Sequence, residues 1–427
     1  MQKLSLTNKY PLHTKYKDSG VEWLGKIPEH WNILKLQRLY QKLKRTGFEK
    51  EELLSVYRDR GVIVKSSRSD NHNNASEDLS TYQLVEVDDL AINKMKAWQG
   101  SLGVSPHRGI VSPAYYVCRP LSNNDSKFIH YLLRSKLYIK QYEQISGGVR
   151  NNQWDLRYEM FRKIEATLPP KEEQGRIAQF LDEQTARIDE IITKKQELIE
   201  LLKEKRTAVI NHAVTRGLDT HAELIDSGID WIGKVPKGWE VKKLKSGFTF
   251  EKGKEAGKFT QEYVSAEQNV GEFPVYSGQT ENEGVLGRIN SFIYDYPDGV
   301  LFSTTVGAKA MTVRLLRNRF SLSQNCVLMV PKNCINPEYF TYLLEIGFLR
   351  MRDEIPSHMQ PSLRVSDLNK FTVLFPPTEQ QAEIANYLRE KDELFNFAIA
   401  KLNSSVTHLK EFKSSIISHA VTGKINI

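Results

Sequence analysis

The sequence of 427 residues contains few cysteines and no long apolar run. Its three cysteines, Cys118, Cys326 and Cys334, are odd in number and none belongs to a C-x-x-C pair. This spacing argues against disulfides and against a zinc site, and predicts reduced, buried thiols. No segment approaches the ~18 to 20 apolar residues of a membrane span, and the N-terminus lacks the apolar core of a signal peptide. We therefore expect a cytoplasmic protein with no metal site.

Catalytic motifs are also missing. An adenine methyltransferase needs an Asn/Asp-Pro-Pro-aromatic loop, whereas the nearest string, Asn336-Pro337-Glu338-Tyr339, lacks the second proline. The glycine-rich segment 253–259 is one residue short of a phosphate-binding loop and ends in Phe259. A metal nuclease needs an acid near Glu-x-Lys, and the Glu411-Phe412-Lys413 string is far from Asp298 in the sequence. The sequence therefore predicts a chain that is not an enzyme.

What the sequence does contain is a long helical segment. Residues 171–216 include no proline and one glycine, which predicts a single helix of roughly 65 Å at ~1.5 Å per residue. Read in heptads, its a and d positions are mostly apolar and predict a partner helix. The apolar seam positions are Ile177, Leu181, Ile188, Ile191, Leu198, Leu202 and Val209.

The partner lies in the same chain, about 207 residues further on. The corresponding apolar positions are Ile384, Leu388, Phe395, Leu402, Leu409, Phe412 and Ile416. Both helical segments follow a double proline, at 169–170 and 376–377, and both end in His-Ala-Val-Thr, at 212–215 and 419–422. The chain is therefore a tandem repeat in which each copy ends in a long helix.

The openings of the two copies repeat as well. Residues 18–31 read DSGVEWLGKIPEHW and residues 226–239 read DSGIDWIGKVPKGW, and we expect their tryptophans to be packing residues. Between opening and helix, each copy is rich in Val, Ile, Tyr and Phe bounded by turn residues, which predicts a β-rich domain. The expected strands include 82–87, 110–118, 299–303 and 326–330, and the expected short helices are 126–144 and its counterpart 337–352.

These observations predict an α+β chain with two β-rich domains separated by two long antiparallel coiled-coil helices, related by a pseudo-twofold internal repeat. We place the first domain at 1–170, the first long helix at 171–216, the second domain at 217–377 and the second long helix at 378–427. Antiparallel helices would act as a ruler between the two domains and would offer two nearly equivalent docking faces to two copies of one partner.

The net charge of +8 is unevenly distributed. Residues 1–170 hold 27 basic and 18 acidic residues, a net +9, whereas residues 217–377 hold 18 and 19, a net −1. The helical segments are neutral, with 9 of each sign in 171–216 and 6 of each in 378–427. Basic charge on the first domain suits a polyanion such as nucleic acid, although a modest lysine excess also serves solubility alone.

The two copies differ most in polar loops at corresponding places. The segment 146–153 stands opposite 357–362, 93–100 opposite 303–309, and 112–115 opposite 323–326. A shared scaffold with different polar side chains suits two readers of different base sequences, since Arg or Lys pairs with guanine and Asn or Gln with adenine. The candidate DNA-binding residues are Lys94, Lys96, Trp98, Gln99, Arg108, Arg150, Asn151, Asn152, Gln153, Ser303, Thr304, Thr305, Lys309, Gln324, Asn325, Ser357, His358 and Gln360.

The twin openings, the twin P-P-x-E-[EQ]-Q helix starts and the twin H-A-V-T endings resemble the specificity subunit of a type I restriction-modification system over the full length of the chain. The resemblance implies two target-recognition domains, each reading one half of a bipartite double-stranded DNA target. It also implies two methyltransferase (modification) subunits and restriction/translocase subunits as partners in phage defence. S-adenosylmethionine, ATP and Mg²⁺ would then bind to those partners, and this chain would bind no cofactor.

Two other classes of function were weighed. An enzyme with its own methyltransferase or nuclease would need the cofactor loop that this sequence lacks. A coiled-coil scaffold without a DNA function would show no sequence preference in a binding assay. The net −1 of the second domain leads to a further hypothesis, that partner subunits supply many of its phosphate contacts.

Overall fold

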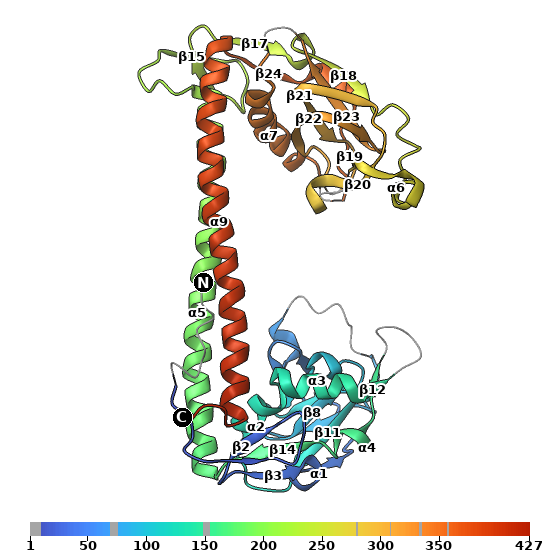
Figure 1. Ribbon diagram of the computed structural model, residues 1–427, viewed down its shortest axis with the longest axis vertical. Coiled ribbons are helices and arrows are strands. Elements are labelled where there is room, and N and C mark those ends of the chain that lie inside the picture. The colour runs from blue at the N-terminus through green and yellow to red at the C-terminus, as the bar shows by residue number, and fades with distance from the viewer. Residues whose placement is uncertain are drawn as a thin grey trace. The chain divides into compact units, whose positions relative to one another are not determined.

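The computed structural model describes residues 10–68, 76–147, 154–278, 281–307, 309–332, 335–356 and 358–427. The chain divides into two compact units. Unit 1 comprises residues 1–196 and 404–427, and unit 2 comprises residues 197–403. Each unit holds one β-rich domain and one portion of each long helix, which matches the α+β repeat expected from the sequence (Figure 1).

The two long helices are α5 (Lys171–Arg216) and α9 (Thr378–Val421). In unit 1, Ile177 and Leu181 near the start of α5 pack in one core with Ile416 and Ala420 near the end of α9. Further along α5, Ile188 packs with residues earlier in α9. The helices are therefore antiparallel within this unit, because residue numbers rise along one as they fall along the other.

Unit 2 contains the complementary ends of the same helices. Ile210 and Val214, near the end of α5, share a core with Ile384 and Leu388, near the start of α9. The direction is again antiparallel, so both units confirm the orientation predicted from the repeat.

The heptad register of the helix-pairing residues is wrong at two positions. Ile191 and Leu198 are 37% and 45% exposed, whereas their neighbours Ile192 and Ile199 are 8% and 5% exposed. Of the other expected positions, Ile177, Leu181, Ile188, Ile384, Leu388 and Ile416 are buried, and Leu202, Val209, Phe395, Leu402, Leu409 and Phe412 are partly buried.

Four of the buried isoleucines of α5 recur every eleven residues, at Ile177, Ile188, Ile199 and Ile210. Eleven residues make three turns at ~3.67 residues per turn, closer to the ~3.6 of a straight helix than the ~3.5 of a heptad, so the repeat drifts less per residue around the helix. An eleven-residue reading therefore keeps one face of a straight helix buried. That pattern was present in the sequence, and the heptad reading missed it.

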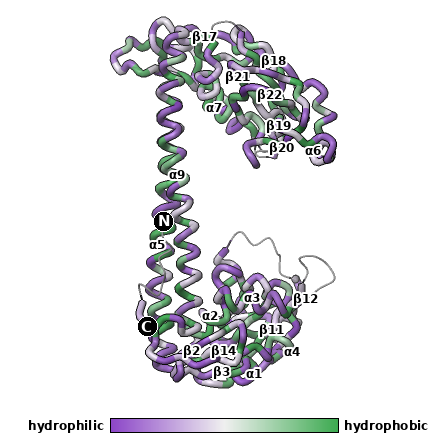
Figure 2. The backbone as a smooth tube through the Cα atoms, viewed as in Figure 1, coloured by the Kyte–Doolittle hydropathy of each residue, from purple (hydrophilic) through white to green (hydrophobic). Residues whose placement is uncertain are grey.

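Both long helices alternate hydrophobic and hydrophilic residues along their length (Figure 2). Their polar faces carry intrahelical ion pairs such as Lys194 with Glu190, at 2.6 Å between Nζ and Oε1. None of the helices in the described ranges is apolar over a long enough stretch to cross a bilayer.

The domain of unit 1 is built on a four-stranded antiparallel sheet of order β4-β11-β8-β9. Smaller antiparallel pairs are β1 with β2, β3 with β14, β5 with β6, β7 with β10 and β12 with β13. The strands are β1 (Tyr16–Asp18), β2 (Lys26–Pro28), β3 (Asn32–Lys35), β4 (Tyr40–Leu43), β5 (Leu54–Tyr57), β6 (Gly61–Val64), β7 (Gln83–Val85), β8 (Leu90–Asn93), β9 (Leu102–Val104), β10 (Gly109–Val111), β11 (Tyr115–Pro120), β12 (Ser146–Gly147), β13 (Asp155–Leu156) and β14 (Glu165–Leu168). The central strand β8 is apolar and buried over its first three residues, as expected of a strand covered on both faces.

The expected helix 126–144 is broken into α2 (Ser126–Leu133) and α3 (Lys136–Ile145). Arg134, at the break, donates from its guanidinium to the backbone oxygens of Leu102, at 2.8 Å, and Arg58, at 2.9 Å. The Tyr142 hydroxyl donates to the carbonyl of Leu133 at 2.9 Å. The Tyr142 hydroxyl thus satisfies the Leu133 carbonyl, which a continuous helix would have paired internally. The other short helices of unit 1 are α1 (Leu36–Leu39) and α4 (Tyr158–Phe161).

The domain of unit 2 is built on a six-stranded sheet of order β18-β23-β21-β22-β19-β20, in which only β19 and β22 pair in parallel. Two further pairs, β15 with β16 and β17 with β24, repeat the β1–β2 and β3–β14 pairs of unit 1. The strands are β15 (Leu224–Asp226), β16 (Lys234–Pro236), β17 (Glu240–Lys243), β18 (Phe248–Lys252), β19 (Val270–Tyr276), β20 (Val285–Ile289), β21 (Tyr294–Thr304), β22 (Val313–Leu322), β23 (Cys326–Pro331) and β24 (Thr372–Phe375). The helices are α6 (Gln261–Ser265), α7 (Pro337–Asp353) and α8 (Val365–Lys370).

The repeated helix starts attach each domain to its long helix through a buried glutamine. Gln174, 2% exposed, donates to the carbonyl of Pro169 at 2.9 Å and accepts from the backbone N–H of Asp125, the N-cap of α2, at 2.9 Å. Gln381 makes the same two bonds in unit 2, to Pro376 at 2.8 Å and from Asn336, the N-cap of α7, at 3.0 Å. The twin motifs therefore fix the same joint in both units.

The tryptophans of the repeated openings pack as expected. Trp31 is fully buried and its indole Nε1 donates to Glu173 Oε1 on α5 at 3.0 Å. Trp239 donates in the same way to Gln380 Oε1 on α9 at 2.7 Å. Each indole thus joins an opening segment to the long helix that starts in its own unit.

Candidate nucleic-acid interface

Two polar loops of unit 1 and strand β13 meet through backbone hydrogen bonds. The loop after β8 starts at Lys94, whose N–H donates to the carbonyl of Ala114 in the loop before β11, at 3.3 Å. The carbonyl of Lys94 accepts from the N–H of Leu156, in β13, at 3.0 Å. Segments separated by up to about sixty residues in the sequence therefore form one surface.

The corresponding loops of unit 2 meet through the same bonds. The N–H of Thr305 donates to the carbonyl of Asn325 at 2.8 Å, and the carbonyl of Thr305 accepts from the N–H of Leu363 at 2.8 Å. Thr305 thus occupies the position that Lys94 holds in unit 1. The backbone scaffold is common to the two units while the side chains on it differ, and a pair of readers with different specificities requires this arrangement.

A cleft of about 1000 Å³ opens beside the loops of unit 1. Its wall includes the predicted residues Lys96 and Gln99 and parts of both the 93–101 and 112–115 segments. Lys65, Arg58 and Arg68 also line it, and Asp59 is the one acidic residue among the described lining residues. Arg68 is paired with Asp59, so Lys65, Lys96 and Arg58 supply the positive charge that suits phosphates.

Aromatic rings accompany this charge. Tyr57, Tyr82 and Tyr115 line the cleft, and the Arg68 guanidinium lies 4.5 Å from the centre of the Tyr57 ring. Arg68 also donates from Nη1 to Asp59 Oδ2 at 3.0 Å. Stacked aromatic and guanidinium groups provide flat surfaces for bases, which basic side chains alone do not.

The β5–β6 hairpin was missed by the sequence analysis although it contributes much of this cleft. It supplies Tyr57 and Arg58. The Arg-Asp-Arg turn at 58–60 between two apolar strands was a usable signal. The candidate residues all lie in loops at corresponding places of the two repeats, and this hairpin is not one of those loops.

Two other predicted residues of unit 1, Lys94 and Trp98, have structural partners. Lys94 Nζ lies 5.1 Å from the centre of the Tyr116 ring. Trp98 packs on Trp154 with ring centres 5.2 Å apart, and its Nε1 donates to the carbonyl of Met95 at 3.1 Å. These contacts make Trp98 a support for the loop that carries Lys96 and Gln99.

Arg108 is engaged in an ion pair. Its guanidinium donates to Glu51 Oε1 at 2.8 Å and contacts Glu86, and these bonds raise the pKa of Arg108 above its usual value. A phosphate would have to compete with two carboxylates for this group. Its side chain is 46% exposed, and the role of Arg108 as a phosphate contact stays a prediction.

In unit 2, Ser303 and Thr304 are buried, at 0% and 1% exposed, and cannot contact DNA. They lie in β21, and the Thr304 hydroxyl donates to the carbonyl of Lys309 at 2.6 Å. The expected strand 299–303 already contained Ser303, and β21 ends one residue later, at Thr304, with both residues buried. Their predicted role as DNA contacts is wrong.

The remaining predicted residues of unit 2 surround the shared scaffold. Thr305 is partly buried, and Lys309, Gln324, Asn325, His358 and Gln360 are exposed. Gly307 donates its N–H to the carbonyl of Pro361 at 3.2 Å, which ties the loop of Lys309 to that of Gln360. Arg150, Asn151, Asn152, Gln153 and Ser357 lie outside the described residues.

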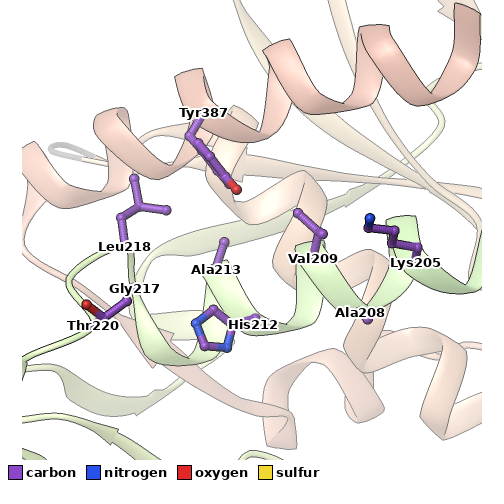
Figure 3. A pocket seen from close by; sticks show the side chains of 9 residues that line it. All are labelled: Lys205, Ala208, Val209, His212, Ala213, Gly217, Leu218, Thr220 and Tyr387. Carbon is purple, nitrogen blue, oxygen red and sulfur yellow. The ribbon is translucent and has the colours of Figure 1, made fainter.

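Two other features bear on possible chemistry: the thiols of Cys118 and Cys326, and a second pocket. Burial raises the pKa of the Cys118 and Cys326 thiols to about 12, so neither is a nucleophile at neutral pH. A separate pocket of about 400 Å³ in unit 2 lies where α5 ends, lined by His212, Val209 and Tyr387 among others (Figure 3). None of its lining residues belongs to the predicted DNA-binding set.

Comparison with known proteins gives consistent matches over most of the chain. The family model described as type I restriction modification DNA specificity domain matches residues 28–201 and again 236–408. The chain is 21% identical to the type I restriction enzyme StySPI specificity subunit of Salmonella potsdam, over 94% of this chain and 90% of that one. It is 22% identical to the EcoKI specificity subunit of Escherichia coli K12, with the same coverage of each.

A solved structure described as "Structural basis underlying complex assembly and conformational transition of the type I R-M system" contains a similar chain. The TM-score is 0.67 at 14% identity, and the match covers 92% of this chain and 98% of that one. At this identity the likeness shows a shared fold and nothing more.

Proposed function

The chain belongs to the family of type I restriction modification DNA specificity domains, and from this premise we propose that it reads a bipartite DNA target, one half with each recognition domain. The observation that carries this proposal is the pair of matching loop scaffolds. Lys94 and Thr305 make the same two backbone hydrogen bonds in their units, yet one side chain is a cation and the other a short hydroxyl. The same framework can thus present different groups to different bases.

In unit 1 the cleft supplies both kinds of DNA contact. Lys65, Lys96 and Arg58 would neutralise phosphates and set the position of the duplex, and Gln99 would pair with a base edge. In unit 2, Lys309 would contact phosphate, and Gln324, Asn325, His358 and Gln360 are the groups able to read bases. The predicted loop of Arg150 to Gln153 would add base contacts in unit 1.

The partners we propose are two methyltransferase (modification) subunits and restriction/translocase subunits. Four large apolar side chains on the long helices of unit 2 are exposed, and they offer a surface for protein partners. They are Leu198 (45%), Leu201 (60%), Leu394 (63%) and Phe397 (60%). The internal repeat supports two copies of one modification subunit, since each repeat would present an equivalent face.

The chemistry of the system would reside on those partners. S-adenosylmethionine for adenine methylation, and ATP and Mg²⁺ for translocation and cleavage, would bind to the partner subunits, and this chain would act as a non-catalytic specificity subunit in the cytoplasm. Since residues 217–377 carry a net −1, partner subunits would also supply phosphate contacts to the second half-site. Equal salt dependence of DNA binding by the lone chain and by the assembled complex would reject that last point.

The role of the cleft is tested with charge-removing variants in the assembled complex. Lys65→Ala and Lys96→Ala should each weaken binding to DNA of any sequence and lower the slope of log K against log salt by about one. Lys35→Ala, an exposed lysine on β3, is the matched control and should leave the slope unchanged. If all three variants give the same slope, the cleft is not the phosphate-binding surface.

A further inference from the structure

Three potential metal ligands converge in unit 1 at the first turn of α5. They are His13, in the segment before β1, His30, in the turn before β3, and Glu173 of α5. One ligand atom from each lies within 4.8 Å of the others, and His30 Nε2 is 2.8 Å from Glu173 Oε2. The sequence spacing hides this set, because the residues are far apart in the chain and form no short motif.

The carboxylate is held in place by a neighbour. Glu173 is 7% exposed, and its Oε1 accepts the hydrogen bond from the buried Trp31 indole at 3.0 Å. That bond fixes the orientation of the carboxylate and leaves Oε2 directed at the two histidines. Metal-binding carboxylates are commonly oriented by such a second hydrogen bond.

His13 carries a nitrogen with no partner among the described residues. Its Nε2 is shielded from solvent and makes no hydrogen bond. The ring stands edge-on to Trp31 with centres 6.0 Å apart. In the neutral tautomer that carries its proton on Nδ1, the lone pair of the unpartnered Nε2 is available to a metal ion.

Unit 2 shows that the joint between an opening segment and its long helix forms without the full set of three ligands. The positions that correspond to His13, His30 and Glu173 are His221, Gly238 and Gln380. Trp239 still donates to Gln380 Oε1 at 2.7 Å, so an amide suffices to hold the indole. The carboxylate and the second histidine of unit 1 therefore exceed what the repeated fold requires.

We propose that His13, His30 and Glu173 bind one zinc ion, with water as the fourth ligand. Two imidazoles and one carboxylate form an N/O set that suits Zn²⁺, whose bonds to such atoms are ~2.0 to 2.2 Å. Ligand atoms around a tetrahedral ion of that size lie ~3.3 Å apart. On binding, His30 and Glu173, now 2.8 Å apart, would separate by about 0.5 Å, and the longest separation in the set, at most 4.8 Å, would shorten by up to about 1.5 Å. The His30 side chain is 49% exposed and free of the core, which gives it room to turn.

The ion would fasten the segment around His13 to the first turn of α5 and stabilise unit 1 alone. Binding to the folded state raises stability in proportion to the logarithm of the free zinc concentration. The proposed zinc ion is structural, so the proposal holds or fails independently of DNA recognition.

The test uses the full chain, purified without a histidine tag, and isothermal titration with zinc chloride. Wild type should bind one Zn²⁺ per chain, and His30→Gln and Glu173→Gln should each weaken that site by tenfold or more. Glu173→Gln recreates the acceptor that Gln380 provides to Trp239, so the indole keeps its hydrogen bond. His221→Gln, at the corresponding position of unit 2, is the matched control and should bind as wild type does.

Cobalt substitution and melting supply readouts that do not depend on the heat of binding. Co²⁺ in the wild-type site should give the intense visible bands of four-coordinate cobalt, and zinc should raise the melting temperature of wild type but not of His30→Gln. Absence of a one-to-one site in wild type, or equal binding by wild type and His30→Gln, would overturn the proposal and leave His30 and Glu173 as a hydrogen-bonded pair only.

Discussion

The buried glutamines at the helix starts give a quantitative prediction about how each domain is attached. Gln174→Leu keeps the approximate volume of the side chain but removes three hydrogen bonds: to Pro169, from Asp125 and to Asn124 Oδ1, at 2.9, 2.9 and 3.0 Å. Each such bond contributes about 1 kcal/mol net, and a buried backbone group left unpaired costs ~1 to 3 kcal/mol. We therefore expect a loss of about 3 to 5 kcal/mol in the free energy of unfolding.

The matching change in unit 2 should cost less. Gln381→Leu removes two bonds, to Pro376 and from Asn336, so the expected loss is about 2 to 4 kcal/mol. Gln179→Leu is the control on α5, because Gln179 is exposed and pairs with Glu183 on the same helix, and it should change stability by less than about 0.5 kcal/mol.

Urea denaturation followed by far-UV circular dichroism measures these losses. If the units unfold in separate transitions, Gln174→Leu should move that of unit 1 and Gln381→Leu that of unit 2. The reasoning is refuted if Gln174→Leu behaves like Gln179→Leu, since the repeated spacing of proline and glutamine in the two units would then have no structural cause in these bonds.

Three further changes test other contacts. Burial and, secondarily, the charge of Arg134 lower the pKa of His130 to about 4, so the folded state takes up a proton at His130 less readily than the unfolded state. The free energy of unfolding should therefore fall by about 3 kcal/mol as the pH drops from 6.5 to 4. His130→Gln should flatten that pH dependence, measured by urea titrations at several pH values. Arg206→Gln breaks the ion pairs from α5 to Glu345 and Asp392 and should lower the free energy of unfolding of unit 2 by about 2 kcal/mol. Thermal melting measures this loss, and an unchanged melting temperature would exclude a structural role for the pairs. Gly109→Ala places a Cβ 2.4 Å from the backbone oxygen of Glu52 and should cost about 1 to 3 kcal/mol, whereas Gly147→Ala meets no atom within 4 Å and should be neutral in the same melt.

Much of the fold could be predicted from the sequence because the repeat supplies long-range information. Two copies of one motif imply two copies of one structure, and apolar residues spaced along 171–216 imply a helix with a buried side. The details that failed depend on tertiary contacts. The helix is interrupted at Arg134, whose guanidinium bonds to the carbonyls of Leu102 and Arg58, and no local pattern reveals these distant partners.

The candidate site was predictable in part for the same reason. Comparing the repeats identified the loops that meet at Lys94 and Thr305, because divergence on a shared scaffold is visible in the sequence. It could not show that Ser303 is buried, since residues 299–304 of β21 are all buried and only the tertiary packing covers both faces of the strand. It also could not bring Arg58 to the cleft, because the β5–β6 hairpin reaches the loops only through the tertiary fold.

The central claim is that two recognition domains read separate halves of one DNA target. The most direct measurement is a map of methylated adenines in DNA from cells that express the complete system, with the wild-type chain or with residues 1–170 exchanged for those of a relative. We predict a target of two short specific sequences separated by unspecified bases, of which the exchange alters one and leaves the other and the spacing intact. A contiguous target, or a change in both halves after the exchange, would contradict the account.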